Sequence, residues 1–164
     1  MGAGKSTLGR MLAGALEKTF VDSDHYIEER AGADIPWIFD LEGEAGFRDR
    51  ETQALDELTQ RPNLVLATGG GAVVRRENRA LLASRGVVIY LRTEVDTQLA
   101  RTAKDKNRPL LQKADPRAVL TELLLAREPH YLALADIVVD TEGASPRALA
   151  DTIVQEYRTR YENA

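Results

Sequence analysis

Short apolar runs rich in β-branched residues alternate along this chain with longer segments whose apolar positions recur every three or four residues. The short runs end in turn or polar residues, as buried strands do, and the longer segments have the periodicity of helices that pack on one face. Strands that alternate with helices form a parallel sheet covered on both faces, so the pattern predicts the α/β class. The predicted strands are 20–21, 64–67, 87–91 and 137–139, and predicted helices include 47–58, 75–84, 94–103, 116–127 and 145–157.

The composition limits the class of protein. With 164 residues and 43% hydrophobic content, residues 1–164 are expected to form one domain. The chain has no cysteine, which excludes disulfides, zinc–thiolate sites and thiol nucleophiles, and we see no signal peptide or apolar run of membrane length. We therefore expect a cytoplasmic protein that binds no membrane. A net charge of −4 gives no general attraction to nucleic acid, so function is expected in a small-molecule pocket.

A phosphate-binding loop opens the chain, where residues 1–7 read MGAGKST. Gly4, Lys5 and Ser6 end the pattern G-x-x-x-x-G-K-[ST], in which backbone N–H groups surround phosphates, the lysine reaches the β and γ oxygens and the hydroxyl binds Mg²⁺. Taken alone, these residues also fit a glycine-rich cap on an ordinary helix. The first glycine of the pattern would lie before Met1, so we expect Met1 to be an internal methionine of a longer loop.

Two carboxylates follow the first predicted strand. Asp22 and Asp24 are two residues apart, so their side chains can point to one side, toward the helix of the phosphate loop. One could hold Mg²⁺ or its water ligands, and the other could accept a proton from a substrate hydroxyl. The alternative is that Asp24 only caps the helix that it precedes.

A carboxylate interrupts the apolar stripe of the helix predicted over 47–58. Glu51 shares that stripe with Phe47 and Leu55, and a carboxylate on a buried stripe requires a partner. Arg48, three residues earlier, can supply it. The pair is either a plain surface salt bridge or a device that turns the free edge of the guanidinium toward a ligand carboxylate.

Arg127 shows the same anomaly on the helix predicted over 116–127. It falls on an apolar stripe with Leu120 and Leu124, directly before Glu128 and Pro129. Because proline has no N–H and clashes with the preceding turn, we expect Pro129 to interrupt the helix. An inward arginine at a helix break is a candidate for anion binding, although a side chain that extends to solvent fits the pattern equally well.

Two other segments favour ligand binding. The run Gly69-Gly70-Gly71 follows the strand at 64–67 and allows another group, such as a substrate, to approach the backbone closely. Residues 104–109 are a polar, charged interruption between two helices, which predicts a mobile loop. Arg108 in that loop could move onto transferring phosphates, or it could be part of a solvated run of charge.

Taken together, these motifs resemble the shikimate kinases, small cytoplasmic enzymes of the P-loop class similar to nucleoside monophosphate kinases. The resemblance runs from Met1 to the C-terminus and rests on six motifs in the family's order and spacing. They are GAGKST at 2–7, DSD at 22–24, FRDRE at 47–51, TGGG at 68–71, RPLL at 108–111 and REPHY at 127–131. The resemblance implies a three-layer fold with a central parallel sheet of strand order 2-3-1-4-5. It also implies ATP-dependent phosphorylation of the 3-hydroxyl of shikimate, a step toward chorismate and the aromatic amino acids.

The resemblance further implies a role for each matching residue. The residues implied for the nucleotide are Gly2, Ala3, Gly4, Lys5, Ser6, Thr7, Arg101, Arg108, Ser145 and Pro146, with Arg101 and the Ser145-Pro146 region beside adenine. Those implied for shikimate are Asp24, Arg48, Gly70 and Arg127, and those for Mg²⁺ are Ser6 and Asp22. Lys5, Asp24 and Arg108 are implied in catalysis, with Arg108 on a mobile lid at about 104–114.

The chain departs from the family pattern at its N-terminus. The family has a strand before the phosphate loop, and on this resemblance strand 1 of the sheet is absent from the chain. Without that central strand we expect poor solubility or little activity. One alternative function is therefore an inactive nucleotide-binding remnant. Another, which needs only the phosphate loop, is a different small-molecule P-loop kinase, such as a gluconate or nucleotide kinase. We expect a monomer.

Overall fold

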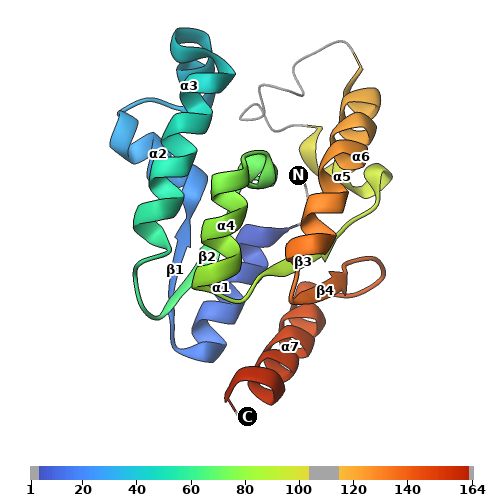
Figure 1. The fold of residues 1–164 in the computed structure, drawn as a ribbon. Helices are drawn as coiled ribbons and strands as arrows, with labels where there is room; N and C mark the ends of the chain where they lie inside the picture. The colour runs from blue at the N-terminus through green and yellow to red at the C-terminus, as the bar shows by residue number, and fades with distance from the viewer. Residues whose placement is uncertain (1–3, 104–114, 163–164) are drawn as a thin grey trace.

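The computed structural model describes residues 4–103 and 115–162, and within these ranges four short strands form two parallel pairs (Figure 1). β1 (Thr19–Asp22) pairs with β2 (Leu64–Ala67), and β3 (Ile89–Arg92) pairs with β4 (Ile137–Asp140). All four coincide with the predicted runs to within two residues, and the α/β class is confirmed. The predicted order 2-3-1-4-5, with strand 1 absent, is not confirmed, because the described strands form two separate pairs and no ladder orders one pair relative to the other.

Helices cover the strand pairs and supply most of the buried apolar side chains. They are α1 (Lys5–Leu16), α2 (Ser23–Ala31), α3 (Ile35–Leu58), α4 (Arg76–Arg85), α5 (Val95–Thr102), α6 (Pro116–Leu134) and α7 (Pro146–Tyr157), with a short turn η1 (Gly70–Val73) and a final turn η3 (Arg158–Glu162). One core joins α1, β4 and α7 through Leu12, Ile137 and Ile153. A second core joins α2 to α3 through Ile27 and Phe47. In the described ranges, no helix combines the length and the apolar character needed to cross a membrane.

Helix α3 begins well before the predicted position and is bent within its length. Gly43 has φ 71° and ψ 178°, a conformation available essentially only to glycine, and it separates two helical segments. The bend is held by Arg50, whose Nε donates to Glu42 Oε1 at 2.6 Å and whose Nη2 donates to Glu42 Oε2 at 2.9 Å. The segment after the bend is the predicted helix 47–58, and it carries Arg48 into the molecule.

The prediction that Pro129 interrupts its helix is wrong. α6 continues through Pro129 to Leu134, where Ala135 N donates to the Tyr131 carbonyl at 2.9 Å. Proline removes one intrahelical donor and favours a kink, but contacts on both sides of it hold this helix together. Glu128 accepts a hydrogen bond from Tyr90, and Tyr131 donates one to the backbone of Gly70.

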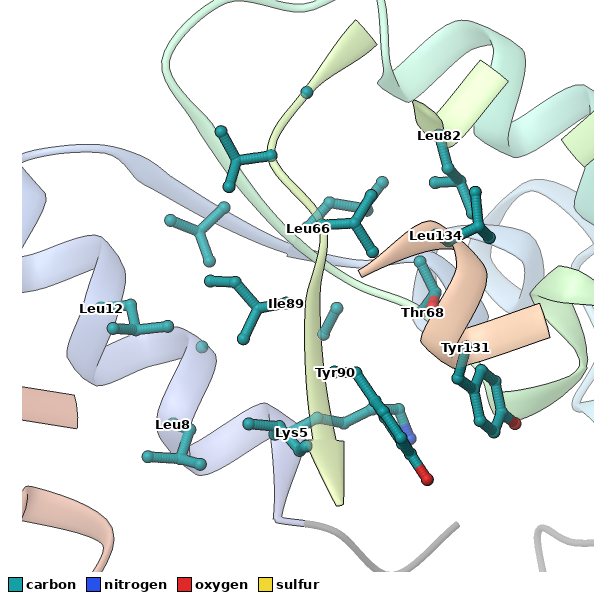
Figure 2. A pocket seen from close by; sticks show the side chains of 18 of the residues that line it. Lys5, Leu8, Leu12, Leu66, Thr68, Leu82, Ile89, Tyr90, Tyr131 and Leu134 are labelled. Carbon is teal, nitrogen blue, oxygen red and sulfur yellow. The ribbon is translucent and has the colours of Figure 1, made fainter. Parts of the chain in front are cut away.

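A cavity of about 570 Å³ lies between the two strand pairs (Figure 2). Leu8 and Leu12 of α1 line one side, and Leu66 of β2 and Ile89 of β3 line others. The facing edges of β2 and β3 meet no further strand within the described part of the chain. The cavity is therefore an apolar space at the centre of the fold, between sheet edges that retain pairing capacity.

Candidate active site

The phosphate loop leads directly into α1. Gly4 is the residue before the helix and has φ 75°, a left-handed conformation that glycine adopts without strain. In the described residues no side chain caps this helix end, so the first-turn N–H groups and the positive end of the helix dipole suit an anion. Arg101 Nη1 lies 3.8 Å from the position that a Cβ on Gly4 would occupy. Gly2 and Ala3, predicted members of the loop, lie outside the described residues.

Asp22 links α1 to the start of α2. The Ser6 hydroxyl donates to Asp22 Oδ2 at 3.1 Å, while Asp22 Oδ1 accepts from the backbone N–H groups of Asp24 at 2.9 Å and His25 at 3.3 Å. Asp22, rather than Asp24, is therefore the residue that caps α2. The cap leaves Asp24 in the first turn of the helix, beside the two residues predicted to hold Mg²⁺.

The Ser6 and Asp22 side chains fit a magnesium ion. A hydroxyl and a carboxylate held 3.1 Å apart are hard oxygen ligands, the type that Mg²⁺ prefers. Within the described ranges no group of three or more histidine, aspartate or glutamate side chains could hold a metal ion by itself. Mg²⁺ beside nucleotide phosphates is usually bound by one or two protein oxygens together with phosphates and water, which agrees with this arrangement.

Three side chains from three helices meet at the glycine run after β2. Asp24 Oδ1 of α2 lies 2.9 Å from the position of a Cβ on Gly69, and Arg48 Nη1 of α3 lies 2.2 Å from that position on Gly71. Between them, the Tyr131 hydroxyl of α6 donates to the Gly70 carbonyl at 2.6 Å. The expected close approach to this backbone is therefore observed, but at Gly69 and Gly71 the approaching groups are side chains of the protein itself.

Arg48 and Glu51 form a buried pair, so the alternative of a surface salt bridge is wrong. Arg48 is 6% exposed and Glu51 is fully buried, and Arg48 Nη1 donates to Glu51 Oε1 at 3.0 Å. Arg48 Nη2 donates to Glu44 at 3.3 Å. Burial raises the pKa of Glu51, and the adjacent Arg48 opposes that rise. The Arg48 Nε is buried without a hydrogen-bond acceptor among the described residues.

Arg127 also points inward, as one of the two interpretations of its position predicted. It is 5% exposed, and its Nε is likewise buried with no acceptor in the part of the chain that the structure describes. Burial lowers the pKa of Arg127, and the positive charge of Arg48 contributes in the same direction. The two guanidinium groups are thus close enough to influence each other, and each keeps a buried donor that an anion would satisfy.

Ser145 and Pro146 begin α7, with the Ser145 hydroxyl accepting from Ala148 N at 3.1 Å, as the predicted cap and first-turn proline require. Arg108 and the predicted lid at 104–114 lie outside the described residues. Sequence reasoning missed the role of the Tyr131 hydroxyl. The available signal was its spacing of four residues from Arg127, which places both side chains on one face of α6.

The fold and the site define a class of protein. A phosphate loop at a helix start, an acidic strand end beside it and two buried inward arginines are the parts of a P-loop kinase that acts on a small acidic acceptor.

Comparison with known proteins identifies the family within that class. Residues 1–158 match the family model described as shikimate kinase. A shikimate kinase of Psychrobacter arcticus is 59% identical over 156 residues, which cover 95% of this chain and 84% of the relative. One from Chromohalobacter salexigens is 57% identical over 155 residues, covering 94% and 86%. The chain belongs to the shikimate kinase family.

Solved structures of the family have the same fold. The structure of shikimate kinase from Acinetobacter baumannii in complex with shikimate superposes with a TM-score of 0.96 at 52% identity, covering 98% of this chain and 90% of that one. The enzyme from Aquifex aeolicus gives a TM-score of 0.81 at 30% identity, covering 100% and 95%. Shikimate kinases use ATP with Mg²⁺, so the predictions of family, enzyme class and cofactors are confirmed.

Proposed function

We propose that this chain transfers the γ-phosphoryl group of ATP to the 3-hydroxyl of shikimate, giving 3-phosphoshikimate and ADP. The observation that carries the proposal is the pair of buried arginines, Arg48 and Arg127, whose Nε donors have no acceptor among the described residues. Arg48 approaches the glycine run that Asp24 also approaches, and Arg127 lines the same cavity as Gly70. Shikimate has one carboxylate and several hydroxyls, which suits two guanidinium groups beside a carboxylate. The binding of shikimate by the similar Acinetobacter protein supports this choice of acceptor.

In this proposal the two arginines hold the shikimate carboxylate. Glu51 fixes one edge of the Arg48 guanidinium through the 3.0 Å hydrogen bond, so the remaining donors of Arg48 are oriented before the ligand arrives. Arg127, on α6, binds the same carboxylate, and the Gly70 backbone contacts the ring of the acceptor. A bound carboxylate would also relieve the repulsion between the two buried positive charges.

Asp24 orients the acceptor and takes its proton. The 3-hydroxyl oxygen bonds to the γ-phosphorus as the bond from that phosphorus to the β,γ-bridging oxygen breaks, and ADP leaves. The hydroxyl proton passes to the Asp24 carboxylate. Asp22 supports this geometry, since its carboxylate accepts the Asp24 N–H at 2.9 Å and so fixes the first turn of α2.

The nucleotide occupies the loop at residues 2–7, with Lys5 at the β and γ phosphates and Arg101 beside the loop. Ser6 and Asp22 hold Mg²⁺, which when bound neutralises charge on the phosphate oxygens. Ser145 and Pro146 bound the adenine side, and Arg108 on the lid at 104–114 closes over the phosphates. The protein acts as a cytoplasmic monomer on a small molecule, without nucleic acid or membrane partners, in keeping with its net charge of −4.

ADP release with shikimate, gluconate and nucleoside monophosphates tests the substrate. Shikimate alone should support turnover, and ATP binding without turnover on any acceptor would contradict the proposal.

Changing Arg48 or Arg127 to alanine should raise KM for shikimate at least about 30-fold, because it leaves a buried charge unpaired. KM for ATP should change less than about twofold, because neither arginine is proposed to contact the nucleotide. Arg158→Ala, at an exposed arginine of η3, is the control and should behave as wild type.

A further inference from the structure

Tyr131 connects three elements around the acceptor site. Its hydroxyl, on α6, donates to the Gly70 carbonyl at 2.6 Å across 61 residues of sequence. The centroid of its ring lies 4.9 Å from the ring centroid of Tyr90 on β3, with an angle of 35° between the ring planes. Arg127 stands one helical turn before Tyr131 on the same face of α6. The side chain therefore joins the turn that carries Arg127 to the glycine run.

Tyr90 holds the same turn of α6 from a second direction. The Tyr90 hydroxyl donates to Glu128 Oε2 at 2.7 Å, and Arg92 Nη2 lies 3.4 Å from Glu128 Oε1. β3 thus contacts the helix at Glu128 through a hydrogen bond and at Tyr131 through ring packing. Aromatic rings in contact prefer particular relative orientations, so the packing against Tyr90 restricts the orientation of the Tyr131 ring.

We propose that Tyr131 is a positioning residue for acceptor binding, which sets the separation between the Arg127 guanidinium and the Gly70 backbone. This inference rests on the proposed function, in which both groups contact shikimate. Arg127 and Gly70 come from distant parts of the chain, and the Tyr131 hydrogen bond joins the helix that carries Arg127 to Gly70. Without the bond, the glycine run and α6 are free to move apart, and a ligand that spans them loses one of its contacts.

The role is one of positioning rather than chemistry. The single proton of the Tyr131 hydroxyl is already donated to the Gly70 carbonyl, so it is not available to a substrate oxygen. Burial raises the pKa of this hydroxyl, which keeps the proton in place throughout the neutral range. Tyr131 therefore acts on the substrate through Gly70 and Arg127.

Steady-state kinetics of Tyr131→Phe test the proposal, because this change removes the hydroxyl and keeps the ring. We expect KM for shikimate to rise about 5- to 20-fold, as for a lost hydrogen bond. KM for ATP and kcat should stay within about twofold. Tyr161→Phe, at an exposed tyrosine of η3 whose ring packs on Tyr157, is the matched control and should leave all three constants unchanged. An unchanged KM for shikimate in Tyr131→Phe, or an equal rise for both substrates, would overturn the proposal.

A double-mutant cycle with Arg127→Lys distinguishes positioning from a general loss of stability. If Tyr131 acts through Arg127, the loss of kcat/KM for shikimate in the double mutant should be smaller than the product of the two single-mutant losses. A loss equal to that product would overturn the proposal.

If Tyr131→Phe does not fold, Tyr90→Leu serves instead, because it removes the packing that orients Tyr131. It should also raise KM for shikimate several-fold, and no rise would count against the proposal. Failure of the wild-type chain to phosphorylate shikimate would refute the proposed function itself, before any variant is compared.

Discussion

The guanidinium of Arg48 occupies the space where a side chain on Gly71 would begin. A Cβ on Gly71 would stand 2.2 Å from Arg48 Nη1 and 2.5 Å from its Cζ. The φ angle of Gly71 is not in the left-handed region, so the backbone conformation does not demand glycine. Glycine is required at this position because the arginine packs directly on the peptide.

Gly71→Ala should therefore damage acceptor binding. Overpacking in a well-packed site costs about 1 to 3 kcal/mol, and here the extra methyl group must displace a buried guanidinium. We expect KM for shikimate to rise at least about tenfold, with little change for ATP. Gly14→Ala is the matched control. Gly14 lies within α1, and a Cβ at this position would meet no atom within 4 Å. It should raise the free energy of unfolding by about 0.5 to 1 kcal/mol and leave kinetics unchanged. Equal kinetics for the two variants would contradict the packing argument.

Asp24→Asn should separate catalysis from nucleotide binding. Asparagine keeps the shape of the side chain and loses the charge that is proposed to orient the acceptor hydroxyl and take its proton. We expect kcat to fall about 100-fold or more, with KM for ATP within about twofold. Asp34→Asn is the control, since the Asp34 carboxylate accepts the Trp37 N–H as the cap of α3, a role that asparagine keeps. Wild-type turnover in Asp24→Asn would remove Asp24 from the chemistry.

Glu51 gives a prediction about pH. Burial raises its pKa above the ordinary value of 4.5, so between these two values the folded protein binds more protons than the unfolded chain. The contribution of Glu51 to stability is therefore greatest below pH 4.5 and is lost as pH rises through the raised pKa. Urea unfolding of wild type and Glu51→Gln from pH 4 to 8 isolates this contribution. The wild-type free energy of unfolding should fall relative to the variant as pH rises, and an increase would mean that Arg48 lowers this pKa below its ordinary value.

The cavity between the strand pairs gives a prediction about stability. An extended apolar segment joined ahead of Met1, of the type Ile-Val-Leu-Ile-Gly-Pro, could pair with β2 and β3 and bury its side chains against Leu8 and Ile89. Each buried side chain contributes about 1.5 to 3 kcal/mol, so the melting temperature should rise by about 10 °C or more, with higher activity on shikimate. A Ser/Thr/Gly segment of the same length is the control. Equal melting temperatures and turnover for the two extended chains would contradict this role for the cavity.

Local patterns in the sequence predicted much of the fold and site. The apolar runs gave the strands because a buried parallel strand must be apolar along its whole length, as at Leu64–Ala67. The partnership of Arg48 with Glu51 followed from helical spacing and from the cost of burying an unpaired carboxylate. Neither inference required knowledge of the rest of the chain.

Features that depend on distant parts of the chain could not be predicted in this way. Pro129 is tolerated in α6 because Glu128 and Tyr131 are held by Tyr90 and Gly70, and no local rule contains those contacts. The reason for glycine at position 71 is a side chain from another helix. The separation of the strands into two pairs depends on which strand edges form hydrogen bonds with each other. The hydrophobic pattern of the sequence indicates only that each strand is buried.

The two oxygens of Asp22 serve two sides of the site at once. Oδ2 accepts from Ser6 at the proposed nucleotide side, and Oδ1 accepts from the backbone of Asp24 at the proposed acceptor side. A shift of this carboxylate toward a metal ion at Ser6 would therefore change the support of the turn that carries Asp24. Two ligands that act on one shared group are thermodynamically coupled, and the coupling is reciprocal. Occupation of the nucleotide site should then alter the affinity for the acceptor, and the acceptor should alter nucleotide affinity by the same factor.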